Sequence, residues 1–124
     1  MEDPGKRDLK KLINSYCFFQ QCYKFNMQQI NCEDRRLHKS IINSETPHKK
    51  IEHLEKLRDF QNLLNETERQ MKKVQFAIQT FLDLNAPLQN TKDSQEATRL
   101  IEEQNGLEKK ILNANMFQVG VLET

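Results

Sequence analysis

The sequence predicts an all-α fold, an antiparallel three-helix bundle with up-down-up connectivity and coiled-coil-like packing. Three segments repeat apolar side chains at helical spacing, and two short polar breaks that contain proline separate them, at 44–47 and 85–90. The chain has only three glycines and three prolines, too few for the many tight turns of a β-rich protein. We therefore expect a single helical domain over residues 1–124, with helices at about 6–43, 47–85 and 93–116 and a tail at 117–124.

The first segment carries an uninterrupted seven-residue repeat. Its start is indicated by Asp3, Pro4 and Asp8, because acidic caps and a proline in the first turn favour helix initiation. One position of the repeat is apolar throughout, with Leu9, Tyr16, Tyr23, Ile30 and Leu37. The position three residues later begins with Leu12 and Phe19 and then becomes polar, with Asn26, Glu33 and Ser40. We expect looser packing in the second half of this helix.

The second segment has the clearest start signal. Thr46 can cap the first turn while Pro47 fills the first helical position, and Pro87 ends the helix because it disfavours helical geometry at the residue before it. The residues predicted to face the other helices repeat every seven positions: Leu57, Leu64, Met71 and Ile78. Three residues after these come Phe60, Thr67, Val74 and Phe81, respectively, and we call the two rows together the second-helix seam.

The third segment is shorter and begins at a predicted capping box. Asp93 is the expected cap, with Glu96 in the position that reaches back to it. The residues expected to be buried are Ala97, Leu100, Leu107, Ile111 and Ala114. Helical periodicity is lost after about residue 116.

Composition argues against several classes of partner. The formal charge of +1 does not indicate a phosphate-binding surface, so we expect no nucleic acid partner. No apolar run approaches the roughly 20 residues that cross a bilayer, so we expect no membrane insertion. The first residues lack the apolar core of a secretory signal, which predicts a cytoplasmic or nuclear protein whose three cysteines are reduced.

The sequence shows no constellation of catalytic or metal-binding residues. It contains no phosphate-binding glycine loop, no nucleophile elbow and no paired-cysteine or H-E-x-x-H spacing. His38, His48 and His53 lie near the first break, but five-residue spacing turns the last two away from a common ligand on a helix. We predict a non-enzymatic protein with no catalytic residues, no cofactor and no metal site.

The pattern resembles a spectrin repeat over nearly the whole chain. The stretch 48–60, HKKIEHLEKLRDF, continued by 61–83, looks like the long central helix of that family, and 91–111 looks like the beginning of the same helix in another register. The family usually carries a tryptophan in its first helix, and this chain has none. The resemblance implies a spacer or docking module of the kind found in cytoskeletal cross-linkers, nuclear-envelope linkers and some guanine-nucleotide exchange factors.

A second apolar stripe on the first helix is a candidate partner face. It consists of Phe18, Cys22, Phe25 and Cys32 and is turned roughly 130° from the centre of the core stripe at 100° per residue. One explanation is that each helix of a bundle touches two neighbours and so has a broad apolar arc. The other is a face that docks a helix of a second copy or of a different protein.

The end of the predicted bundle that contains the first break is a second candidate partner surface. A third helix from Asp93 to about Met116 spans only about 36 Å, against about 55 Å for each of the others. The shortfall leaves an end patch of Leu37, Ile41, Ile42, Ile51, Leu54 and Leu57. Either the tail folds back over this end patch or a partner docks there.

Charge differs between the two ends. Residues 35–58 hold seven basic and three acidic side chains, and residues 83–103 hold five acidic and two basic ones. In an up-down-up bundle these segments lie at opposite ends. Their charge either is simply solvated or guides head-to-tail stacking or binding to an acidic partner.

The expected function is protein–protein interaction as a scaffold or spacer in a cytoskeletal or signalling protein, with helical partners that include a second copy. The alternative is a small coiled-coil subunit of an obligate assembly, of the chromosome-segregation or membrane-tethering type. An autonomous repeat folds alone, whereas an obligate subunit needs its partner. A four-helix cytokine is disfavoured by the missing secretory signal and by cysteines confined to one helix.

Overall fold

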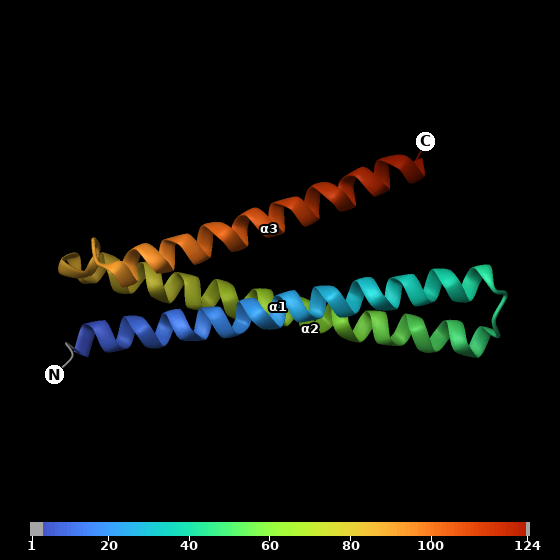
Figure 1. The fold of residues 1–124 in the computed structure, drawn as a ribbon, viewed down its shortest axis with the longest axis horizontal. Coiled ribbons are helices and arrows are strands. Elements are labelled where there is room, and N and C mark those ends of the chain that lie inside the picture. The colour runs from blue at the N-terminus through green and yellow to red at the C-terminus, as the bar shows by residue number, and fades with distance from the viewer. Residues whose placement is uncertain (1–3, 124) are drawn as a thin grey trace. The chain divides into compact units, whose positions relative to one another are not determined.

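The computed structural model is all-α, as predicted, and it describes the backbone of residues 4–123 and the side chains of residues 4–112. The long helices are α1 (Pro4–Ile42), α2 (Pro47–Leu84) and α3 (Lys92–Glu123), and a short 3-10 helix, η1 (Ala86–Leu88), precedes α3 (Figure 1). Within the described residues, no helix combines the length and apolar character needed to cross a membrane.

Two of the predicted helices have the expected bounds to within two residues, but the third does not. The α3 helix continues to Glu123, through the segment predicted to be a non-helical tail. It is therefore about 48 Å long at 1.5 Å per residue, and the premise of a short third helix was wrong. The side chain of Ala114 and those of the predicted tail lie outside the described residues.

The chain divides into two compact units, where the sequence had suggested one domain. The first unit joins Met1–Ile13 to Ala77–Thr124, and the second consists of Asn14–Phe76. The long helices α1 and α2 each contribute to both units, because the divisions fall within them.

The second unit is an antiparallel helical hairpin made by residues 14–42 of α1 and 47–76 of α2 (Figure 1). Tyr16, Tyr23 and Met71 are its buried apolar residues, whereas Ile30 and Leu37 are only half-buried. The remaining buried side chains of the hairpin are polar: Gln20, Asn26, Glu33, Ser40 and Thr67. Burial of the apolar position of the repeat therefore weakens toward the turn, while the polar position beside it stays buried there.

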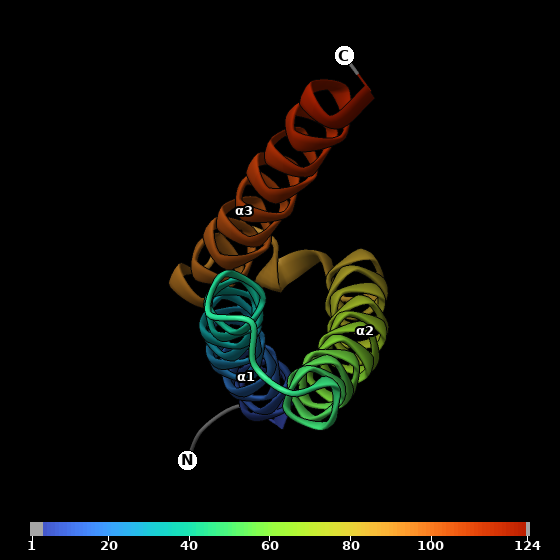
Figure 2. The same ribbon diagram turned by 90° about the vertical axis from the view of Figure 1, so that its right-hand side faces the viewer.

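Figure 2 shows the short connection between α1 and α2, whose hydrogen bonds form a Schellman motif. The Glu45 N–H donates to the Ser40 carbonyl at 3.0 Å and the Ser44 N–H donates to the Ile41 carbonyl at 3.2 Å. Ser44 has a φ of 54°, the left-handed conformation that this motif requires. The chain then re-enters a helix at Thr46, whose Oγ1 accepts from the Lys49 N–H at 3.4 Å, which confirms the predicted cap.

The first unit packs the start of α1, the end of α2, η1 and α3 around an interior that is mostly apolar but includes Ser94 and Gln104. Its buried apolar side chains are Leu9, Ile13, Ile78, Leu82, Leu88, Ala97 and Leu100. Farther along the predicted buried face of α3, Leu107 and Ile111 are half-buried. This unit has the three-helix packing that the sequence predicted.

The link from α2 to α3 is held by side chains that hydrogen-bond to helix ends. Asn85 Nδ2 donates to the Phe81 carbonyl at 2.7 Å, and Gln89 Nε2 donates to the Leu82 carbonyl at 3.0 Å. The cap of α3 is Thr91, whose Oγ1 accepts from the Ser94 N–H at 3.2 Å. The prediction of Asp93 as this cap was wrong by two residues.

Candidate functional site

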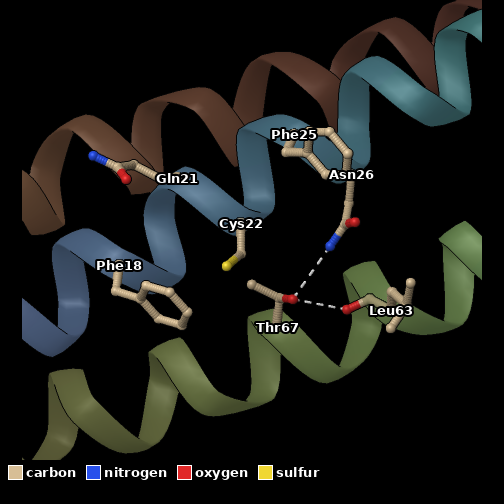
Figure 3. A pocket seen from close by; sticks show the side chains of 7 residues that line it. All are labelled: Phe18, Gln21, Cys22, Phe25, Asn26, Leu63 and Thr67. Carbon is tan, nitrogen blue, oxygen red and sulfur yellow. Dashed lines mark hydrogen bonds between the residues drawn. The ribbon is translucent and has the colours of Figure 1, made fainter.

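A groove on the hairpin is the candidate functional site. It is formed by five residues of α1 and two of α2 and has a volume of about 410 Å³ (Figure 3). We call it the hairpin groove, and its lining residues are Phe18, Gln21, Cys22, Phe25, Asn26, Leu63 and Thr67. All seven belong to the second unit, so the groove is complete within the hairpin.

Large apolar side chains in the hairpin groove are open to solvent. Phe18 is 61% exposed, Phe25 is 55% exposed and Leu63 is 53% exposed. The Phe18 ring also packs edge-to-face on Phe19, with ring centroids 5.5 Å apart. Exposing aromatic surface to water is unfavourable at roughly 25 cal/mol per Å², so these rings favour contact with another apolar surface.

The floor of the groove is a polar contact between the two helices. Asn26 Nδ2 donates to Thr67 Oγ1 at 3.4 Å, and Thr67 Oγ1 donates to the Leu63 carbonyl at 2.8 Å (Figure 3). Asn26 and Thr67 are both buried. A buried polar pair of this kind fixes the register of two helices, because a shift along the helix axis would leave the amide without its partner.

The spacing of the α1 residues matches a coiled-coil hole. Phe18, Gln21, Cys22 and Phe25 stand at positions i, i+3, i+4 and i+7 of one helix, the four positions that surround a side chain inserted from a facing helix. On the α2 side, Leu63 and Thr67 are one turn apart and border the same depression. The geometry therefore suits a side chain projecting from another helix.

The chemistry of the lining is that of a binding surface. None of its seven residues carries a formal charge, and the Cys22 thiol is free and half-buried. Among the side chains that the structure describes, no group of His, Cys, Asp and Glu has the arrangement to hold a metal ion. The lining offers apolar contact with a few amide and hydroxyl groups, which suits recognition of a largely apolar partner.

Charged side chains next to the groove on α2 are paired with each other. Glu66 accepts hydrogen bonds from Arg69 and from Gln70, the latter at 2.9 Å. These hydrogen bonds, that from Arg69 first, lower the pKa of the Glu66 carboxyl below its usual value. The pairing satisfies this carboxylate within α2.

Between the groove and the turn, the hairpin holds a buried carboxylate. The Glu33 side chain is 3% exposed; its Oε1 accepts from Arg36 and its Oε2 lies 3.4 Å from His53 Nδ1 on α2. At the turn, Ser40 Oγ donates to Glu45 Oε2 at 2.7 Å and so lowers the pKa of that carboxyl. The Glu33–His53 contact connects the two helices, and the Ser40–Glu45 contact connects α1 to the turn.

Each of the three histidines contacts an oxygen atom of a different residue. His48 Nε2 lies 3.2 Å from Glu52 Oε1, and His38 Nδ1 lies 2.8 Å from the Asp34 carbonyl oxygen. With His53 beside Glu33, each histidine has its own neighbour, and the structure does not bring the three together.

The structure places three of the four residues of the predicted partner face in the hairpin groove. Phe18, Cys22 and Phe25 line it, whereas Cys32 is half-buried and does not. Sequence reasoning missed Gln21, Asn26, Leu63 and Thr67 as lining residues. Leu63 offered a signal, because it is an apolar residue outside the second-helix seam, but which residues of α1 it would meet depended on the pairing of the helices.

The end patch surrounds the turn of the hairpin. Ile42 is 81% exposed, while Ile41, Ile51 and Leu54 are about half exposed, at 55%, 51% and 49%. Leu37 and Leu57 are half-buried. The basic segment 35–58 includes this patch and belongs to the second unit, whereas the acidic segment 83–103 belongs to the first.

Comparison of the chain with protein-family models, with curated protein sequences and with solved structures finds no significant match. The spectrin-repeat resemblance therefore stays a prediction based on the residues that carry it. The fold and the hairpin groove are the basis for proposing a function.

Proposed function

We propose that this protein is a non-enzymatic protein-interaction module that binds a helix of a protein partner in the hairpin groove. The observation that carries the proposal is the groove itself, in which Phe18, Phe25 and Leu63 remain more than half exposed around a coiled-coil hole. Helix-in-groove binding uses apolar anchors at helical spacing, and this lining offers the complementary surface.

Composition supports a protein partner. Interface centres are enriched in aromatic residues and depleted of charged ones, and the groove combines two phenylalanines with an uncharged lining. The buried Asn26–Thr67 contact holds the two helices in register, so the groove is formed before a partner arrives. A pre-formed site loses less conformational entropy on binding.

The long helices suit a scaffold or spacer role of the kind that the spectrin-repeat resemblance implies, in a cytoskeletal or signalling protein. The α1 and α2 helices have 39 and 38 residues, which corresponds to about 58 Å of rise each. A protein with helices of this length can hold two binding partners apart while it binds a partner's helix in the hairpin groove.

The polar interior of the hairpin favours a second candidate, a small coiled-coil subunit of an obligate assembly. Five polar residues are buried in the second unit while apolar side chains stay exposed on it, which is the balance expected of a helix pair that a partner completes. Circular dichroism of the purified chain separates the candidates: cooperative thermal unfolding of the isolated chain supports an autonomous module, and a non-cooperative melt supports an obligate subunit.

Site-specific photo-crosslinking in cells tests the groove. A benzophenone amino acid replaces Gln21, which is exposed and lines the groove; the control replaces Phe76, which is 74% exposed and lies outside the lining. We expect a discrete covalent adduct from position 21, mapped by mass spectrometry to a helical segment of a protein, and none from position 76. Equal labelling at both positions, or none at position 21, would contradict the proposal.

A further inference from the structure

We infer that the helix that fills the hairpin groove comes from a second copy of this chain, so that two hairpins pair through the same surface. The inference rests on the proposed function and names its partner. In a two-fold contact the same patch meets itself, so the patch must be self-complementary in charge and in shape. The hairpin groove and the part of α1 that forms it satisfy both conditions.

The α1 segment that forms the groove is almost free of charge. Residues 14–32 contain a single charged residue, Lys24, although 30% of the residues in the whole chain are charged. Solvent-facing positions of this stretch hold neutral side chains, among them Asn14, Gln21 and Gln28, which are all exposed. A charged patch repels its own copy, whereas the seven residues that line this groove bring no charge to the contact.

The same patch supplies both the hole and the side chains that can fill one. Phe18 and Phe25 border the hole around Gln21 and Cys22, and both rings are more than half exposed and project from α1 (Figure 3). A second copy therefore brings aromatic side chains of the required kind to the hole of the first, and receives the same in return. A different protein would have to supply such side chains on its own.

The available area fits a reversible dimer. Residues 14–32 span about 28 Å of helix, and two helices side by side are about 20 Å wide, so this hairpin face measures about 560 Å². A standard protein interface buries about 800 Å² on each partner. The face is somewhat smaller than that, which predicts a dimer that dissociates on dilution.

Sedimentation equilibrium of the full chain under reducing conditions tests the dimer. We expect the wild-type mass to rise from monomer to dimer with concentration, and the F18S/F25S variant to stay monomeric with unchanged helicity. Phe76→Ser is the control, because it removes a ring outside the groove that is even more exposed than Phe18 and Phe25, and it should dimerise like the wild type. A monomeric wild type at millimolar concentration, or a dimeric F18S/F25S variant, overturns the inference.

A charge exchange at Gln21 gives an answer even if the double variant does not fold. Gln21 is exposed, so neither Gln21→Glu nor Gln21→Arg removes a buried contact. In a two-fold contact each variant places like charges near the centre, so we expect each homodimer to weaken at least about tenfold, with partial recovery at high salt. An equimolar mixture should form a heterodimer at least as tight as the wild type; the same weak association in the mixture would contradict self-pairing.

The photo-crosslinking experiment separates this inference from the proposed function. An adduct between position 21 and another copy of the chain supports both. An adduct to a different protein, with a monomeric purified chain, overturns the second-copy inference and leaves the interaction module intact. Absence of any adduct at position 21 together with a monomeric chain overturns both.

Discussion

The two units of this chain share the helices α1 and α2 but differ in what they bury. Among its described residues, the first unit, where three helices pack, buries seven leucine, isoleucine and alanine side chains and two polar ones, Ser94 and Gln104. The second, a two-helix hairpin, buries Gln20, Asn26, Glu33, Ser40 and Thr67 beside only three large apolar residues. It also exposes most of the large apolar side chains found exposed among the described residues: Phe18, Phe25, Ile41, Ile42, Ile51, Leu54, Leu63 and Phe76.

The number of helices in each unit explains why the two units bury different side chains. Two helices meet along one seam and cannot enclose a thick apolar core, so part of the apolar surface of each stays exposed unless another element covers it. Polar contacts such as Asn26–Thr67 and Glu33–His53 then set the register of the pair at some expense of stability. The first unit thus encloses more apolar surface than the hairpin does.

The largest expected effect is the loss of unfolding free energy when a large apolar side chain is shortened, compared between the two units. Ile78 is 1% exposed in the first unit, and Ile78→Ala should lower the free energy of unfolding by about 2–4 kcal/mol through lost burial and a residual cavity. Leu64 is half-buried in the hairpin, and Leu64→Ala should cost about half as much. Urea denaturation at one protein concentration measures both, and equal losses would show that the two units pack equally well.

The next effect concerns the polar floor of the groove. Thr67→Val should lower the free energy of unfolding by about 1–3 kcal/mol, because it leaves the buried Asn26 amide without its hydroxyl partner. The double variant Asn26→Leu/Thr67→Val replaces both polar groups and should recover most of this loss. The same urea experiment reports both values. A double variant no more stable than Thr67→Val would mean that the pair does not act as a unit.

The smallest effect is a gain at the turn. Ser44 adopts a positive φ of 54°, which favours glycine, so Ser44→Gly should raise the free energy of unfolding by about 0.5–1 kcal/mol. Asn43→Gly is the control, since Asn43 is not among the residues with positive φ and gains nothing from glycine. Thermal melts followed by circular dichroism compare the two; a stabilised Asn43→Gly variant would refute the explanation by φ.

Local signals in the sequence were sufficient to predict three helices and most of their ends. Thr46 and Pro47 start α2, and Pro87 follows its end, because a cap and a proline act within one helical turn. The end of α3 was not predictable in the same way. Its last segment contains no proline, and a helix can continue without an apolar period because its backbone hydrogen bonds are internal.

The candidate site was predictable in part for a similar reason. Phe18, Cys22 and Phe25 share a face of one helix, so their spacing alone brings them together. Leu63 and Thr67 enter the groove from another helix, 38 and 42 residues after Phe25, and their place depends on how α1 and α2 align. Periodicity identifies the faces of helices but not the register between them.

The sequence by itself determined that this protein is all-α, where two of its three long helices begin and end, and that α1 carries a second apolar stripe. Only the tertiary structure decided that the stripe joins Leu63 and Thr67 in one groove and that its phenylalanines stay exposed. The physical reason is range: helix formation and its caps act over a few residues, whereas burial and grooves arise from pairings between residues far apart in the chain.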